Sequence, residues 1–185
     1  MTTDQLGGDG TSGIVEADVL YIGQTRGQGK GSHASKKQQV VALVERQGRV
    51  RAFHVLMVTV ENLKPILTEQ IAQSARLMSD GAGQYEKIGK GFKSHEADNH
   101  AANKYIRGDV TTNTVEGYFG ILKRGLRGVY QHVSPAHLHR YVNEFSFRYN
   151  NRSSLEISDR ERARIALEGT DGERPTYRRP AETPA

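Results

Sequence analysis

Residues 39–60, QVVALVERQGRVRAFHVLMVTV, contain two β-rich runs separated by a short turn with a glycine. Consecutive strands joined by so short a turn pair as a hairpin, and a hairpin is antiparallel. The sequence therefore predicts antiparallel strands over 39–45 and 50–60.

The residues on either side of this hairpin extend the sheet. The run 14–22 is rich in β-branched residues and stops at Gly23, which predicts a first strand. After the hairpin, the apolar residues of 61–74 recur at helical spacing, and the short apolar run 76–79 predicts a fourth strand. A strand, a hairpin, a helix and a further strand predict an α/β fold with a mixed sheet flanked by helices.

The second half of the chain is predicted to be mostly helical. A short helix over 83–88 is followed by a connection through His95, and the C-terminal helices are expected from about 112, over 135–149 and over 158–167. The polar loop 24–37 is expected to be mobile. The predicted organisation is a disordered lead over 1–12, one domain over 13–168 and a flexible tail over 169–185.

Composition narrows the class of protein. The chain has 185 residues, of which 36% are hydrophobic and 25% charged, so it can form one core. It has no cysteine, which excludes disulfides, cysteine zinc ribbons and iron–sulfur sites. The longest apolar run, 53–60, is far too short for a membrane helix, and the N-terminal residues lack a signal-peptide pattern. We expect a cytoplasmic, nucleoid-associated protein without a membrane partner.

The net charge is +5, and its distribution is uneven. The segment 99–152 contains eight lysines and arginines but only three acidic residues. Nucleic acids are the polyanions that a basic surface most often meets in a cell, so this segment suggests a DNA- or RNA-binding face.

Three carboxylates are candidates for chemistry, and each has a simpler interpretation. Asp18 lies within an apolar strand, where it either faces the core or shares a solvated face with Glu16. Asp80 follows the fourth strand, where ligands collect in α/β sheets, but it also suits a turn. Glu116 lies in a first helical turn, where it can form a capping box with Asn113.

The spacing of the later residues favours a site. Lys123 follows Glu116 by two helical turns and so shares its face, and Gly120 between them leaves room for a bulky anion. An acid on the first strand, an acid after the fourth and a glutamate on a later helix are typical of RNase H-like nucleotidyl-transferases. Three such oxygen donors favour Mg²⁺ and two-metal phosphodiester chemistry.

Several motifs together resemble the bacterial insertion-sequence DDE transposases, in the branch that usually has an N-terminal zinc ribbon. The resemblance spans about 13–177 and is most specific over 112–152. The motifs that carry it are VEAD with YIG at 15–23, SD at 79–80, TNTVEGYF with LKRG at 112–125, RGVY at 127–130, and EF with RYNNR at 144–152.

The resemblance implies the fold, the reaction and the site. It implies an RNase H-like domain that cleaves DNA strands and joins them to a target, with Asp18, Asp80 and Glu116 holding Mg²⁺ or Mn²⁺ and Lys123 contacting DNA. The expected partners are double-stranded DNA, as element ends and as target, and further copies of the chain. The remaining expected DNA contacts are Arg124, Arg127, Asn113, Arg148 and Arg152.

The chain departs from the family pattern at several places. Val19, Leu20 and Gln24 replace the usual residues of the first motif, and Thr111 stands where a histidine is common. The cysteine-free chain begins shortly before Asp18, so we expect a catalytic domain without its terminal-repeat reader. The alternatives are an inactive remnant that binds DNA or a partner transposase, and a nuclease of the same fold.

Overall fold

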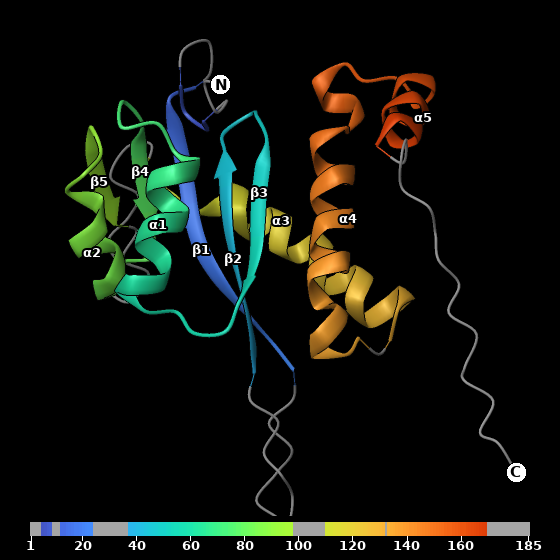
Figure 1. Ribbon diagram of the computed structural model, residues 1–185. Coiled ribbons are helices and arrows are strands. Elements are labelled where there is room, and N and C mark those ends of the chain that lie inside the picture. Colours follow the sequence, from blue (N-terminus) through green and yellow to red (C-terminus); the bar gives the residue numbers. More distant parts are fainter. Residues whose placement is uncertain (1–4, 9–11, 24–36, 98–109, 132, 170–185) are drawn as a thin grey trace, which may run out of the picture. The chain divides into compact units, whose positions relative to one another are not determined.

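The computed structural model describes residues 5–8, 12–23, 37–97, 110–131 and 133–169 (Figure 1). The chain forms two compact units, Met1–Asn150 and Asn151–Ala185. The second unit contains a short turn of helix, η4 (Ser153–Leu155), and α5 (Asp159–Glu168), so the predicted domain over 13–168 spans the boundary between the units. The loop predicted over 24–37 lies almost entirely outside the described residues.

The first unit is built on a mixed five-stranded sheet. Its strand order is β3-β2-β1-β4-β5, in which β1 pairs antiparallel with β2 and parallel with β4. The predicted hairpin is present, and Gln47 in its turn has φ 59°. The strands are β1 (Ile14–Ile22), β2 (Gln38–Glu45), β3 (Val50–Val55), β4 (Arg76–Ser79) and β5 (Ser94–Ala97).

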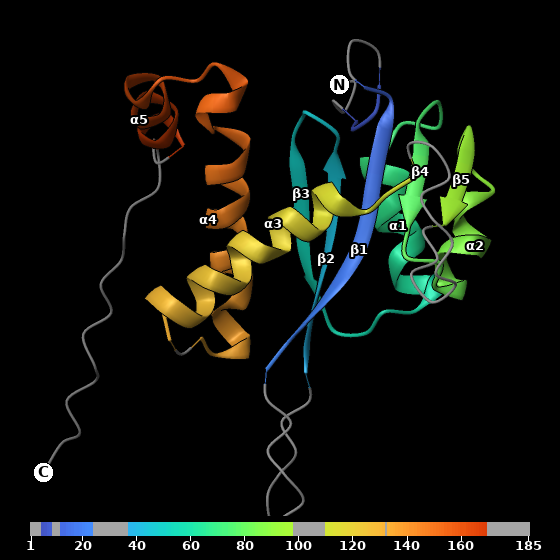
Figure 2. The same cartoon turned by 180° about the vertical axis from the view of Figure 1, so that it is seen from behind.

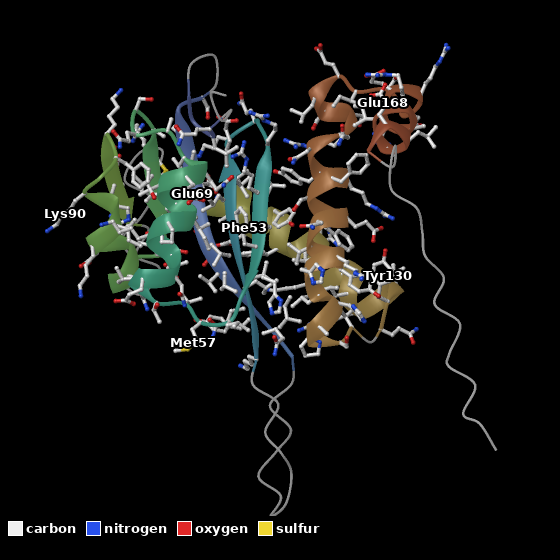
Figure 3. All side chains as sticks on the ribbon, in the orientation of Figure 1. Phe53, Met57, Glu69, Lys90, Tyr130 and Glu168 are labelled. Atoms are coloured by element: carbon white, nitrogen blue, oxygen red, sulfur yellow. The ribbon has the colours of Figure 1, made fainter. Side chains whose placement is uncertain are left out.

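Strand β3 is shorter than the sequence predicted. It ends at Val55 rather than at residue 60, because Thr59 starts the next helix. The Thr59 hydroxyl accepts a hydrogen bond from the Asn62 backbone N–H at 3.3 Å. Such an N-cap satisfies a donor of the first helical turn, and it outweighs the β propensity of the apolar residues that precede it. Met57 lies in the resulting connection (Figure 3).

Strand β5 was not predicted, since a connection was expected at its position. Its four residues, SHEA, have no apolar alternation, and none of them is fully buried. Pairing with β4 holds this edge strand, and Arg76 of β4 forms a 2.7 Å ion pair with Glu96 of β5. An edge strand of this kind is specified by its neighbour, and its own sequence carries little signal.

Helices cover both faces of the sheet (Figures 1 and 2). One face packs against α1 (Val60–Gln70) and α2 (Gly83–Gly89), and the other packs against α3 (Asn113–Arg124) and α4 (Leu138–Asn150). Successive residues of a strand point to opposite faces. Along β1, Val15 and Ala17 therefore lie in the core under α1, while Leu20 lies in the core under α3.

A π-helical turn and a close approach join α3 to α4. The chain continues from α3 into η2 (Gly125–Val129) and returns through η3 (Pro135–His137). A Cβ at Gly125 would overlap the ring of Phe145, so only glycine permits this contact. Tyr130 reinforces it by donating a hydrogen bond to Glu144 of α4 at 2.7 Å (Figure 3).

Part of the predicted disordered lead is packed into the first unit. Leu6 is fully buried, its N–H donates to the Gln70 carbonyl at 2.9 Å, and its carbonyl accepts from Ala72 at 2.9 Å. The neighbouring Gly7 N–H donates to Glu45 at 2.8 Å. One large apolar residue is sufficient to order this short segment against the end of α1. Within the described part of the chain, every helix is too short or too polar to cross a bilayer.

Candidate active site where β1, β4 and α3 meet

Asp18 lies on β1, on the face that α3 covers, and it is partly buried. Its pKa is raised to about 6, chiefly by burial and also by the charges of Asp80 and Glu116. A 2.6 Å hydrogen bond from the Val19 N–H and the charge of Lys123 act in the opposite direction. The fold therefore brings one strand, the end of a second strand and a helix into electrostatic contact at this carboxylate.

Asp80 follows the last residue of β4 and is exposed. Because β4 runs parallel to β1 with Ser79 opposite Ala17, Asp80 lies just past the end of β4 at the level of Asp18 in the middle of β1. Asp80 accepts a 3.2 Å hydrogen bond from the Ala82 N–H, and Gly81 has φ +77°. The turn interpretation of Asp80 is thus correct as local structure.

Glu116 lies in the first turn of α3 and is exposed. The capping box predicted between Asn113 and Glu116 is wrong: Thr112 is the N-cap residue, and its hydroxyl donates to Glu116 at 3.2 Å. The N–H groups of Thr114 and Val115 in the first turn of α3 donate to Glu16 of β1, so Glu116 is not needed for capping.

The basic residues predicted to bind DNA continue along the same helix. Lys123 lies on α3 and is close enough to Asp18 to lower its pKa. A Cβ added at Gly120 would meet no atom within 4 Å, so the surface between Glu116 and Lys123 is open there. Arg124 and Arg127 are exposed further along α3 and η2.

The three remaining residues predicted to contact DNA lie outside the stretch from Lys123 to Arg127. Asn113 is exposed at the start of α3. Arg148 of α4 forms a 2.6 Å ion pair with Glu144 and stacks over Phe145 with its guanidinium 5.8 Å from the ring centre. Arg152 belongs to the second unit.

Glu16 decides between the two interpretations of Asp18 offered by the sequence. The alternative in which Glu16 and Asp18 share a solvated face is wrong, because that face is covered and Glu16 is fully buried. Its carboxylate accepts hydrogen bonds from the Thr114 N–H at 2.7 Å, the Val115 N–H at 3.0 Å and the Thr114 hydroxyl at 2.9 Å. Arg46 neutralises it through a 2.7 Å ion pair. Glu16 thus caps α3 from a strand about 100 residues away, which strand periodicity alone does not reveal.

Tyr85 of α2 was also missed. It is almost fully buried, and its hydroxyl has no hydrogen-bond partner among the described residues. Burial raises its pKa, and the charges of Asp18 and Asp80 raise it further. Tyr85 belongs to the core on the α1 side of the sheet. A buried hydroxyl without a partner is costly, and it is a common feature of functional sites.

The carboxylates suit a hard divalent cation by their chemistry, since Mg²⁺ and Mn²⁺ prefer oxygen donors. In the described part of the chain, no three acidic or histidine side chains are arranged as ligands of one ion. Asp18, Asp80 and Glu116 accept hydrogen bonds from Val19, Ala82 and Thr112, and these local donors orient them.

Comparison with solved structures identifies the fold. The chain resembles the catalytic core domain of BIV integrase with a TM-score of 0.52, at 16% identity, over 86% of this chain and 97% of that one. This likeness confirms the predicted RNase H-like α/β class. The Mos1 strand transfer complex, with a TM-score of 0.34 and 12% identity over 78% of this chain and 54% of that one, is too distant to inform the fold.

Comparison of sequences identifies the family. A protein in the transposable element ISH50 of Halobacterium salinarum, itself uncharacterized, is 26% identical over 153 residues, which are 74% of this chain. The chain spans about half of that relative, 52% of its length. Residues 10–150 match the model of the ISXO2-like transposase domain. Since this match includes β1, β4 and α3 with their carboxylates, the chain belongs to the family of ISXO2-like transposase domains.

Proposed function

We propose that the chain is the catalytic domain of a DDE transposase, which cleaves DNA strands at the ends of an insertion sequence and joins them to target DNA. Two geometric observations carry this proposal in a transposase-family domain. The parallel register of β1 and β4 sets Asp80 beside Asp18 on neighbouring strands. Hydrogen bonds from the Thr114 and Val115 N–H groups to Glu16 hold the first turn of α3, which carries Glu116, against the same stretch of β1.

Asp18, Asp80 and Glu116 are the residues that would hold Mg²⁺ or Mn²⁺. When bound, such ions supply charge stabilisation and Lewis acidity to an in-line phosphodiester displacement. Such a counter-charge would favour the ionised form of Asp18, which burial and two like charges disfavour by raising its pKa.

The reaction has two steps of the same kind. Water attacks a phosphodiester at the element's end and releases a 3′-hydroxyl, and that hydroxyl then attacks a phosphodiester of the target while the target's own 3′-oxygen leaves. Lys123 and Gly120 contribute to binding, the first as a cation and the second by leaving space for the phosphate backbone beside Glu116.

DNA is the partner that the exposed cations of α3 and η2 suit. Lys123, Arg124 and Arg127 follow one another along this stretch and are exposed. Asn113, Arg148 and Arg152 are weaker candidates, since Arg148 is already paired with Glu144. We further propose that copies of the chain act together on paired DNA ends.

The test is a joining assay with the purified full chain. A labelled duplex made from the DNA that flanks the coding region is incubated with supercoiled plasmid and Mg²⁺ or Mn²⁺. Wild type is expected to expose 3′ ends and join them to the plasmid. Asp80→Asn is expected to lose joining but retain DNA binding, measured by mobility shift.

Glu69→Gln is the matched control, because Glu69 is an exposed acid on α1, away from α3 (Figure 3). Its joining rate should equal that of wild type. Unchanged joining by Asp80→Asn would refute the assignment. Binding without turnover by wild type would favour the inactive remnant, and cleavage without joining would favour a nuclease.

A further inference from the structure

The buried pair Glu16–Arg46 contacts each of the three segments that carry the candidate carboxylates. Glu16 precedes Asp18 by two residues on the same face of β1. Its carboxylate binds the N–H groups of Thr114 and Val115, which directly precede Glu116. The α3 backbone is therefore hydrogen-bonded to β1 at the residue directly before Glu116.

Arg46 extends the same set of contacts to the third segment. The Nη2 atom of Arg46 lies 3.1 Å from the sulfur of Met78. Met78 lies on β4, two residues before Asp80. The same nitrogen donates to the carbonyl and hydroxyl of Thr111 at 3.0 Å each, just before α3 begins. The pair thus contacts the chain one or two residues before Asp80 and before Glu116, and Glu16 itself precedes Asp18 by two residues.

The energetic character of the pair fits a positioning role. Glu16 is fully buried and Arg46 is largely buried, with 18% of its side chain exposed. Desolvation offsets much of the attraction in such a pair, so apolar residues of similar volume often give equal stability. Apolar residues make no directional bonds, whereas this pair fixes a strand, a neighbouring strand and a helix N-terminus relative to one another.

We infer that Glu16, held by Arg46, is a positioning residue that sets the separation of Glu116 and Asp80 from Asp18. This inference rests on the proposed function for its meaning. Glu16 itself does not touch DNA, and its carboxylate has its acceptor sites occupied by α3 and Arg46.

The experiment compares Glu16→Gln with Glu45→Gln in the full chain. Glu45 is a matched control because it is equally buried and also accepts a backbone N–H, that of Gly7, which precedes β1. It pairs with Val15, three residues before Asp18 on β1, and its carboxylate contact with Gly7 runs to neither α3 nor β4. Four quantities are measured: unfolding midpoint, amide hydrogen exchange at residues 114 and 115, Mn²⁺ affinity, and joining rate at saturating DNA.

Both variants are expected to lower the unfolding midpoint. Only Glu16→Gln should speed exchange of the Thr114 and Val115 amides, lower Mn²⁺ affinity and reduce joining by about 10–100-fold, since misplacement by about 1 Å has effects of that size. Glu16→Asp, which keeps the charge but shortens the reach, should give an intermediate rate and replaces Glu16→Gln if that variant does not fold.

The outcomes separate the two proposals. If wild type neither binds Mn²⁺ nor joins DNA, the proposed function fails whatever Glu16 does. If wild type is active and Glu16→Gln, with faster exchange at 114 and 115, joins DNA as fast as Glu45→Gln, the positioning role is overturned.

Discussion

Glu16 and Thr114, 98 residues apart in the chain, are joined by two hydrogen bonds, from the Thr114 N–H at 2.7 Å and from its hydroxyl at 2.9 Å. A strand carboxylate therefore does what a helix's own N-cap side chain ordinarily does. Its negative charge also interacts favourably with the positive, N-terminal end of the α3 dipole.

The hydroxyl of this pair can be removed without removing the charge. Thr114→Val is expected to lower the free energy of unfolding by about 1 kcal/mol, the usual net value of one hydrogen bond. Thr114→Ser keeps the hydroxyl and should cost less. Urea denaturation of both variants measures the difference, and equal losses would show that the methyl group, rather than the hydrogen bond, stabilises this contact.

Two glycines of the same region should respond to alanine in opposite directions. Gly125→Ala forces a Cβ against Phe145 and is expected to destabilise the protein by about 1–3 kcal/mol. Gly120→Ala meets no neighbour, and removing a helical glycine should stabilise by about 0.5–1 kcal/mol. Thermal unfolding in a common buffer tests both. Equal shifts would contradict the close contact of η2 with α4.

Asp18 makes stability depend on pH. Its folded pKa, about 6, lies above the ordinary value of 3.8, so the folded state takes up a proton before the unfolded state does as pH falls. The charged form therefore destabilises the fold above about pH 6, and this cost disappears toward pH 4. After allowance for solvent screening, we expect it to be about 1–2 kcal/mol.

Asp18→Asn removes that charge. In EDTA it should be more stable than wild type at pH 7.5, and the difference should vanish near pH 4. Denaturation at the two pH values measures this. A constant difference at both would mean that the asparagine changes packing and that charge is not the cause.

Lys123 is expected to contact a phosphate, so its effect should depend on salt. Lys123→Ala should weaken DNA binding for all sequences and reduce the slope of log affinity against log salt by about 1. Lys90→Ala, which removes an exposed lysine next to α2, is the control (Figure 3). Identical salt slopes for the two variants would exclude Lys123 from the DNA interface.

Local pattern predicted most of the sheet and the order of the candidate acids. Alternation and turn residues define β1, β2 and β4, and helical spacing defines α1, α3 and α4. The pattern failed where a neighbour supplies the stabilisation. β5 depends on pairing with β4, Leu6 on the end of α1, and the end of β3 on the cap at Thr59.

The sequence by itself determined a mixed α/β fold in which Asp18 lies on the first strand, Asp80 follows a later strand and Glu116 lies on a helix further along the chain. Only the tertiary structure decided which acid of β1 is structural. Glu16 and Asp18 share one face and one residue class, so strand periodicity cannot distinguish them. The helix placed over that face does, because its N–H groups and Arg46 reach Glu16, while Asp80, Glu116 and Lys123 surround Asp18.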